Sequence, residues 1–216
     1  VADEGLVEYC DVFCETGVFS LEQTRRIMVR AQELGFKLRL HADEMTALGG
    51  AELAGELGAS SADHLLQVTD AGIQALKAGK VIPVLLPATA FTLKKSYAPA
   101  RKLLNQGLPL ALATDFNPGS SPVPSMLFVI SLACLYMGLT PEEALNAATI
   151  NAAASLGRAD RVGSLAVGKQ ADLVIFDVDY YSKIPYFIGA NVVETVIKEG
   201  KIVYKKPRFK GGCECS

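Results

Sequence analysis

The sequence predicts an α/β fold in which parallel β/α units precede a small group of additional strands. Short apolar segments alternate with segments of helical periodicity from residue 1 to about residue 160. Two of the apolar segments, 81–86 and 108–113, are nearly unbroken, which is typical of strands buried on both faces of a parallel sheet. From about Gly163 the pattern changes to strands joined by a tight turn.

The first unit begins with a predicted strand at residues 7–13. Ser20 opens the segment S-L-E-Q, which has the spacing of a helix capping box, and apolar residues continue the helical period as far as Gly35. Glycine is common just after the last turn of a helix, so we expect the helix to stop there. A second strand is predicted at 36–40. Strand, helix and strand therefore follow one another over the first 40 residues.

The later units repeat this order. We expect strands at 60–64, 81–86 and 108–113 and helices at 48–57, 69–79 and 99–105. Two more helices follow, and the second opens at Thr140 with a cap, an N1 proline and a capping-box acid. Pro83 argues against a central position for its strand, because proline cannot donate to the hydrogen-bond ladder.

Five strands separated by helices fit two architectures. Eight β/α units close a barrel, so five units form either an open doubly wound sheet or a barrel whose first three units precede Val1. The pattern alone leaves both possibilities open. Beyond the units we expect strands at 171–177, 192–198 and 202–204, and residues 205–216, rich in Lys, Gly and Cys, are expected to form a poorly ordered tail.

The composition excludes several classes of function. The net charge is −2, which gives no electrostatic reason to expect a nucleic acid or an anionic membrane as partner. No apolar run approaches the roughly 20 residues of a membrane-spanning helix. Five cysteines are an odd number and too few for a disulfide framework, so we expect reduced thiols and a cytoplasmic location. The chain begins with Val1 rather than Met, which suggests that residues precede it.

The cysteines offer one alternative metal site. Cys10, Cys14, Cys213 and Cys215 together reach the four ligands of a structural zinc site. The usual C-x2-C pairs are absent, and two of these cysteines lie in the expected tail. We therefore do not expect this site.

The two histidines of the chain each lie at the carboxyl end of a predicted strand. His41 follows strand 36–40, His64 closes strand 60–64, and Asp115 follows strand 108–113. Catalytic groups gather at the carboxyl ends of strands in β/α barrels and open sheets alike. Three side chains able to bind a metal at three strand ends therefore predict a shared site. The alternatives are a structural role for each histidine and a turn or helix-cap role for Asp115.

The chemistry of these groups favours metal-dependent hydrolysis. Neutral imidazole and carboxylate suit Zn²⁺ or Fe, and three protein ligands with an open water position form a catalytic site. His41 and Asp115 provide two ligands, so at least one more is needed. Glu44 or His64 would shuttle the proton of the attacking water, although Glu44 could instead cap the following helix. The turn 117–121 is either an anion-binding loop or an ordinary connection.

A family resemblance adds to this interpretation. The segments that carry it are CDVFCETGVFS (10–20), LHADE (40–44), GASSADHLL (58–66), LLPATAF (85–91), LATDFNPGSSP (112–122), ATINAAASLG (148–157) and VGSLAVGKQADLVIFD (162–177). They resemble the amidohydrolase superfamily and, within it, the imidazolonepropionase family. LHADE together with ATDFNPGSS resembles that family more than the superfamily at large.

The resemblance implies a fold, a reaction and partners. The fold would be the later part of a (β/α)8 TIM-type barrel, strands four to eight, over residues 1–160, with part of a small β-sandwich domain over 161–204 and a tail over 205–216. The reaction would be hydrolysis of the ring amide of 4-imidazolone-5-propionate to N-formimidoyl-glutamate in histidine degradation. The complete enzyme would bind one Zn or Fe ion and form a homodimer.

The resemblance also assigns roles to individual residues. His41 and Asp115 would ligate the metal, and His64, Glu44 and Asp115 would be catalytic. Glu44 would also contact the substrate, together with the turn residues Asn117, Gly119 and Ser120.

One departure from the family is large: its first-strand H-x-H pair, which supplies two further ligands, is absent from these 216 residues. We therefore expect a fragment that is inactive alone. Two alternatives are another cyclic-amide hydrolase or deaminase of the superfamily, and a non-catalytic truncated form that acts by binding.

Overall fold

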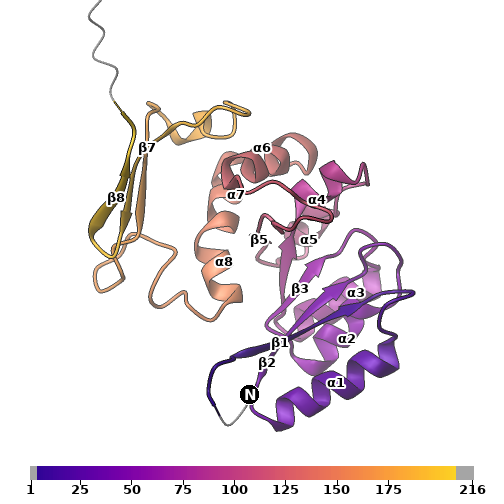
Figure 1. The fold of residues 1–216 in the computed structure, drawn as a ribbon. Helices are drawn as coiled ribbons and strands as arrows, with labels where there is room; N and C mark the ends of the chain where they lie inside the picture. The colour runs from indigo at the N-terminus through magenta and orange to yellow at the C-terminus, as the bar shows by residue number, and fades with distance from the viewer. Residues whose placement is uncertain (1–3, 208–216) are drawn as a thin grey trace, which may run out of the picture.

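The computed structural model describes residues 4–207. Five parallel strands form one sheet in the order in which they occur along the chain. Figure 1 shows the β/α region that contains this sheet. Their bounds are β1 (Tyr9–Cys14), β2 (Lys37–Ala42), β3 (Ser61–His64), β4 (Ile82–Leu85) and β5 (Ala111–Leu112). Each strand pairs in parallel with the next, so all their carboxyl ends meet at one edge of the sheet. The predicted sequence of β/α units is confirmed.

Helices connect the strands. They are α1 (Leu21–Glu33), α2 (Gly50–Leu57), α3 (Asp70–Ala78), α4 (Pro87–Thr92), α5 (Ala100–Asn105), α6 (Met126–Tyr136), α7 (Pro141–Ala148) and α8 (Ile150–Ser155). The capping boxes predicted at Ser20 and Thr140 are both present, and Thr69 caps α3 by accepting from the Gly72 amide. These caps stabilise helix starts because the first amides of a helix lack internal partners.

The two faces of the parallel sheet differ in chemistry. Apolar side chains such as Leu38, Leu40 and Ala62 are fully buried in the main core beneath the connecting helices. The register places His41 opposite Asp63, which brings both onto the other face of the sheet. Because side chains alternate along a strand, one strand can pack a core and present polar groups on its far side.

The structure differs from the sequence expectation in four details. α4 was not predicted, and three helices rather than two follow the last strand of the parallel sheet. β5 has two residues where six were expected. Pro83 lies in a strand that is paired on both sides, but β5 pairs only with Val84 and Leu85. The missing proline amide is therefore not needed on the β5 side.

A second, three-stranded antiparallel sheet follows the parallel one. It comprises β6 (Leu173–Phe176), β7 (Val193–Lys198) and β8 (Lys201–Lys205), with the short 3-10 helix η1 (Tyr181–Lys183) between the first two strands. Glu199 and Gly200 both have positive φ, as a tight primed turn between β7 and β8 requires. The predicted β addition is confirmed and is visible beside the β/α region in Figure 1. Most of the expected tail, residues 208–216, lies outside the described residues.

Within residues 4–207, no helix has both the length and the apolar character required to cross a bilayer.

Candidate metal centre

The three strand-end side chains predicted to share a site do lie together. His41 belongs to the end of β2, His64 is the last residue of β3, and Asp115 lies just beyond β5. One possible ligand atom from each of the three lies within 4.8 Å of the others. The His41 and His64 rings are 5.3 Å apart between centroids. The parallel topology explains this convergence, because strand ends meet at one edge.

His41 is oriented by a carboxylate that sequence reasoning missed. Its Nδ1 donates to Asp11 Oδ1 of β1 at 3.0 Å. This hydrogen bond, which outweighs the opposing effect of burial, raises the pKa of His41. It also occupies one ring nitrogen and leaves Nε2 for another ligand. The sequence signal for Asp11 was a charged residue inside an otherwise apolar strand, three residues before Cys14.

His64 is buried and neutral. Burial, followed by the nearby charge of His41, lowers the pKa of His64 to about 4. Its Nδ1 has no hydrogen-bond partner among the described residues, and its Nε2 lies 3.6 Å from Glu44 Oε2. A buried nitrogen without a partner is uncommon in folded proteins. The imidazole is therefore available to a ligand or to a reacting group.

Glu44 faces His64 rather than capping a helix. The first amides of α2 are instead bound by Asp43, whose carboxylate accepts from Gly49, Gly50 and Ala51. Burial, and then the negative charge of Asp115, raises the pKa of Glu44. The helix-cap alternative for Glu44 is therefore wrong.

Asp115 is held by a threonine from the preceding β/α unit. The hydroxyl of Thr89, a fully buried residue of α4, donates to Asp115 Oδ2 at 2.6 Å. The N-cap of α6 is Ser125, so Asp115 does not cap that helix. Its φ of 51° is the left-handed conformation, which aspartate tolerates better than most residues.

The loop after Asp115 is closed by its own side chains. The Asn117 amide oxygen accepts from the Gly119 and Ser120 amides, and its nitrogen donates to the Asp115 carbonyl. Ser121 donates from its hydroxyl to the Thr114 carbonyl. The polar groups of this loop therefore stabilise the conformation of the turn itself. Substrate contact by Asn117, Gly119 and Ser120 stays a prediction.

A second group of possible donors shares His41. Asp11, His41 and Asp63 also offer atoms within 4.8 Å of one another. Asp63 is already engaged, because Ser61 donates to it at 3.0 Å and Arg39 approaches it at 3.4 Å. Burial raises the pKa of Asp63 even though Arg39 opposes this effect. The His41–His64–Asp115 group, with fewer internal partners, is the better candidate.

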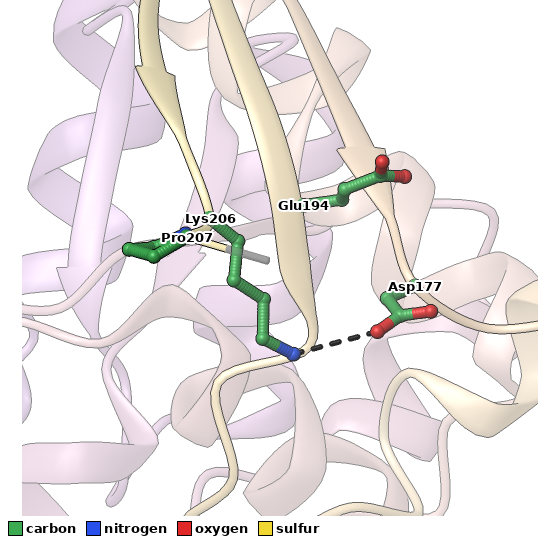
Figure 2. Close-up of a pocket in the computed structure, with 4 residues that line it drawn as sticks. All are labelled: Asp177, Glu194, Lys206 and Pro207. Atoms are coloured by element: carbon green, nitrogen blue, oxygen red, sulfur yellow. Dashed lines mark hydrogen bonds and ion pairs between the residues drawn. The ribbon is translucent and has the colours of Figure 1, made fainter. Parts of the chain in front are cut away.

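Other features compete poorly with this group. Cys10 and Cys14 are free thiols, and burial raises both of their pKa values. Cys213 and Cys215 lie outside the described residues. A hollow of about 390 Å³ is lined by Asp177, Glu194, Lys206 and Pro207, and Figure 2 shows its Lys206–Asp177 ion pair at 3.4 Å. It belongs to the antiparallel sheet and its margin, far along the chain from both histidines.

Comparison with known proteins identifies the family of this chain. The model of the amidohydrolase family matches residues 20–203, which is most of the sequence. The chain belongs to the amidohydrolase family. Its five β/α units are accordingly part of a (β/α)8 barrel accompanied by a small β-domain, so the fold expected from the resemblance is confirmed.

This amidohydrolase chain is similar to curated imidazolonepropionases. It is 56% identical to the imidazolonepropionase of Clostridium tetani over 206 residues, which cover 95% of the chain and 49% of the relative. It is 57% identical to that of Geobacillus kaustophilus over 203 residues, covering 94% and 48%. The chain thus spans about half the length of the curated relatives it matches.

Two solved structures share the fold of this chain. An adenosine deaminase from Xanthomonas campestris with bound zinc is 27% identical, with a TM-score of 0.72 over 86% of this chain and 49% of that one. A mutant atrazine chlorohydrolase, TrzN, from Arthrobacter aurescens is 18% identical, with a TM-score of 0.75 over 90% and 50%. The second likeness is evidence of the fold alone.

Proposed function

We propose that these residues form the later half of an imidazolonepropionase, which hydrolyses the ring amide of 4-imidazolone-5-propionate to N-formimidoyl-glutamate. The observation that carries the proposal is the convergence of His41, His64 and Asp115 within 4.8 Å, in a chain about half identical to proteins of that name. We call the protein of the relatives' full length that includes this sequence the parent enzyme.

The donor set fits a metal ion. Imidazole nitrogen and carboxylate oxygen are the ligands that Zn²⁺ and Fe accept in catalytic sites. His41 would bind through Nε2, because Nδ1 donates to Asp11, and Asp115 would bind through a carboxylate oxygen. A bound ion there supplies the Lewis acidity that lowers the pKa of water towards about 7. We propose either Zn or Fe, with the remaining ligands coming from outside these 216 residues.

Residues of this chain would carry out the proton transfers of the reaction. His64, neutral because its pKa is lowered to about 4, accepts the proton of the attacking water. Its Nε2 lies 3.6 Å from Glu44, so the carboxylate can take up that proton and deliver it to the ring nitrogen as the C–N bond breaks. The raised pKa of Glu44 suits a group that must hold a proton before releasing it. Asn117, Gly119 and Ser120 are proposed to hold the substrate.

The location, oligomeric state and partners are proposed together with the activity. The parent enzyme would act in the cytoplasm, would form a homodimer and would need no nucleic acid or membrane.

The test is turnover by the purified parent enzyme. It should consume 4-imidazolone-5-propionate and release N-formimidoyl-glutamate. The decrease in substrate absorbance measures the rate of this reaction. Activity should disappear on treatment with a chelator and return with added Zn²⁺ or Fe²⁺. The likeness to a zinc-containing adenosine deaminase favours one second candidate, a deaminase. Turnover of adenosine, without turnover of the imidazolone, would overturn the proposal in favour of that alternative.

A further inference from the structure

Glu15 is a fully buried carboxylate that does not belong to the proposed metal group. It directly follows β1, and its residue surface is 1% exposed. Its carboxylate accepts hydrogen bonds from the amides of Thr16 at 2.7 Å, Met45 at 2.8 Å and Thr46 at 3.3 Å, and from the Thr46 hydroxyl. Burial alone would raise the pKa of Glu15, but these bonds lower it overall. The group is therefore a satisfied, ionised carboxylate.

The donors to Glu15 come from the segment that carries Glu44. Met45 and Thr46 are the next two residues after Glu44, in the loop between β2 and α2. On the other side of Glu44, Asp43 accepts from three amides at the start of α2, and its carbonyl accepts from the Gln67 amide at 2.8 Å. The loop is thus fixed immediately before and immediately after Glu44. Glu44 itself lies outside both β2 and α2, so the hydrogen bonds of these two elements do not fix its position.

We propose that Glu15 is a positioning residue that acts through Glu44. By fixing the backbone of residues 45–46 to the end of β1, it holds the Glu44 carboxylate beside His64 at 3.6 Å. Because a displacement of about 1 Å can cost on the order of 10²-fold in rate, this bond set governs proton transfer rather than stability alone. The inference rests on the proposed function, in which Glu44 relays a proton.

A carboxylate suits this position for a simple reason. All four contacts to Glu15 come from N–H or O–H donors, and an ionised carboxylate is an acceptor only. The amide of glutamine has the same shape but presents two N–H groups on one side. In Glu15→Gln the amide would face donors with a donor, so the loop at Met45 and Thr46 would shift.

A control variant and a milder variant isolate the effect of Glu15 on turnover by the parent enzyme. Glu56→Gln is the control, because Glu56 lies in α2 and its exposed carboxylate accepts from Arg25 of α1. Thr46→Val removes the hydroxyl, which also bonds to the Thr16 hydroxyl, but keeps all three amide bonds to Glu15, so it should fold even if Glu15→Gln does not. We expect kcat to fall roughly 10- to 100-fold in Glu15→Gln and less in Thr46→Val, with little change in KM. Glu56→Gln should leave kcat within about twofold.

A double-mutant cycle shows whether Glu15 acts through Glu44. In a Glu44→Gln background, the change Glu15→Gln, or Thr46→Val if the former does not fold, should cost less than about twofold. A full, additive loss in that background would overturn the inference, because Glu15 would then act independently of Glu44.

Amide hydrogen exchange separates this inference from the proposed function. Glu15→Gln, or again Thr46→Val, should speed exchange at Met45 and Thr46 while leaving the α3 amides unchanged. The measurement needs no substrate, so unchanged exchange at those two amides would overturn the inference whatever the enzyme turns over. Failure of the unmodified parent enzyme to hydrolyse 4-imidazolone-5-propionate would count only against the proposed function.

Discussion

Asp11 and His41 are joined by a 3.0 Å hydrogen bond between neighbouring parallel strands, β1 and β2. Metal-binding histidines usually donate their second ring nitrogen to such a partner, which sets the tautomer and the ring orientation. In this chain the carboxylate of Asp11 takes the proton of Nδ1 as a hydrogen bond, which leaves Nε2 for the proposed ion. Asp11 therefore has a defined part in the proposed metal centre although it would not touch the ion.

The first prediction concerns this carboxylate. Asp11→Asn should lower the metal affinity of the parent enzyme by about 10- to 100-fold, which is typical for loss of a partner of a ligating histidine. Competition with a chromophoric chelator measures the affinity. Asp177→Asn, which removes only the exposed Lys206 ion pair, is the matched control and should leave the affinity unchanged. Equal affinities for Asp11→Asn and the unmodified enzyme would contradict the proposed orientation of His41.

The second prediction separates ligands from the proton acceptor. His41→Ala and Asp115→Ala should abolish metal retention, whereas His64→Ala should keep the metal and lose most turnover, by about 10²- to 10⁴-fold. Elemental analysis of the purified variants gives the metal content, and substrate absorbance gives the rate. A full metal complement in His41→Ala or Asp115→Ala would count against the ligand assignment. Loss of metal from His64→Ala would make His64 a ligand.

Much of the fold could be predicted from local sequence because its signals are local. The capping boxes at Ser20 and Thr140 and the two-residue turn at Glu199 depend on neighbouring residues alone, and each occurs where expected. α4 was missed because it begins at Pro87, directly after an apolar strand, so its first residues resemble a continuation of that strand.

Some residues of the candidate site could likewise be predicted from the sequence and others could not. The metal-capable side chains could be predicted because each lies at or just beyond the carboxyl end of a strand, and parallel strands bring these ends together. Their supporting partners were missed, because Asp11, Thr89 and Glu15 act across elements that are distant in sequence. Asp11 lies 30 residues from His41 and Thr89 lies 26 from Asp115. Only the strand register and the loop conformations reveal these pairs.

The third prediction tests the support of Asp115. Thr89→Val keeps the volume of the buried side chain but removes the hydroxyl that donates to Asp115 at 2.6 Å. A hydrogen bond to a charged group is worth about 1.5–3 kcal/mol, so metal affinity should fall by roughly tenfold or more. Thr89→Ser, which keeps the donor, should retain most of the affinity. If valine and serine variants bind metal equally well, the hydroxyl does not support Asp115.

The fourth prediction is a dependence of stability on pH. The folded pKa of Glu15 is lowered, so this carboxylate stabilises the fold above its unfolded pKa, about 4.3. That contribution is lost as the pH falls through the folded value. Urea unfolding of the parent enzyme and of Glu15→Gln should therefore differ most near pH 6–7, and the difference should shrink below about pH 4.

Asp43 provides a control of opposite sign for the same measurement. Burial raises its folded pKa, despite opposing hydrogen bonds from Ala51, Gly50 and Gly49, so protonation favours the folded state. Its titration contributes stability that is fully present below the unfolded pKa, about 3.9, and is lost as the pH rises through the folded value. The stability difference between the parent enzyme and Asp43→Asn should therefore change with pH in the direction opposite to that for Glu15→Gln. If the stability differences of the two variants change with pH in the same direction, the opposite pKa shifts of Glu15 and Asp43 are contradicted.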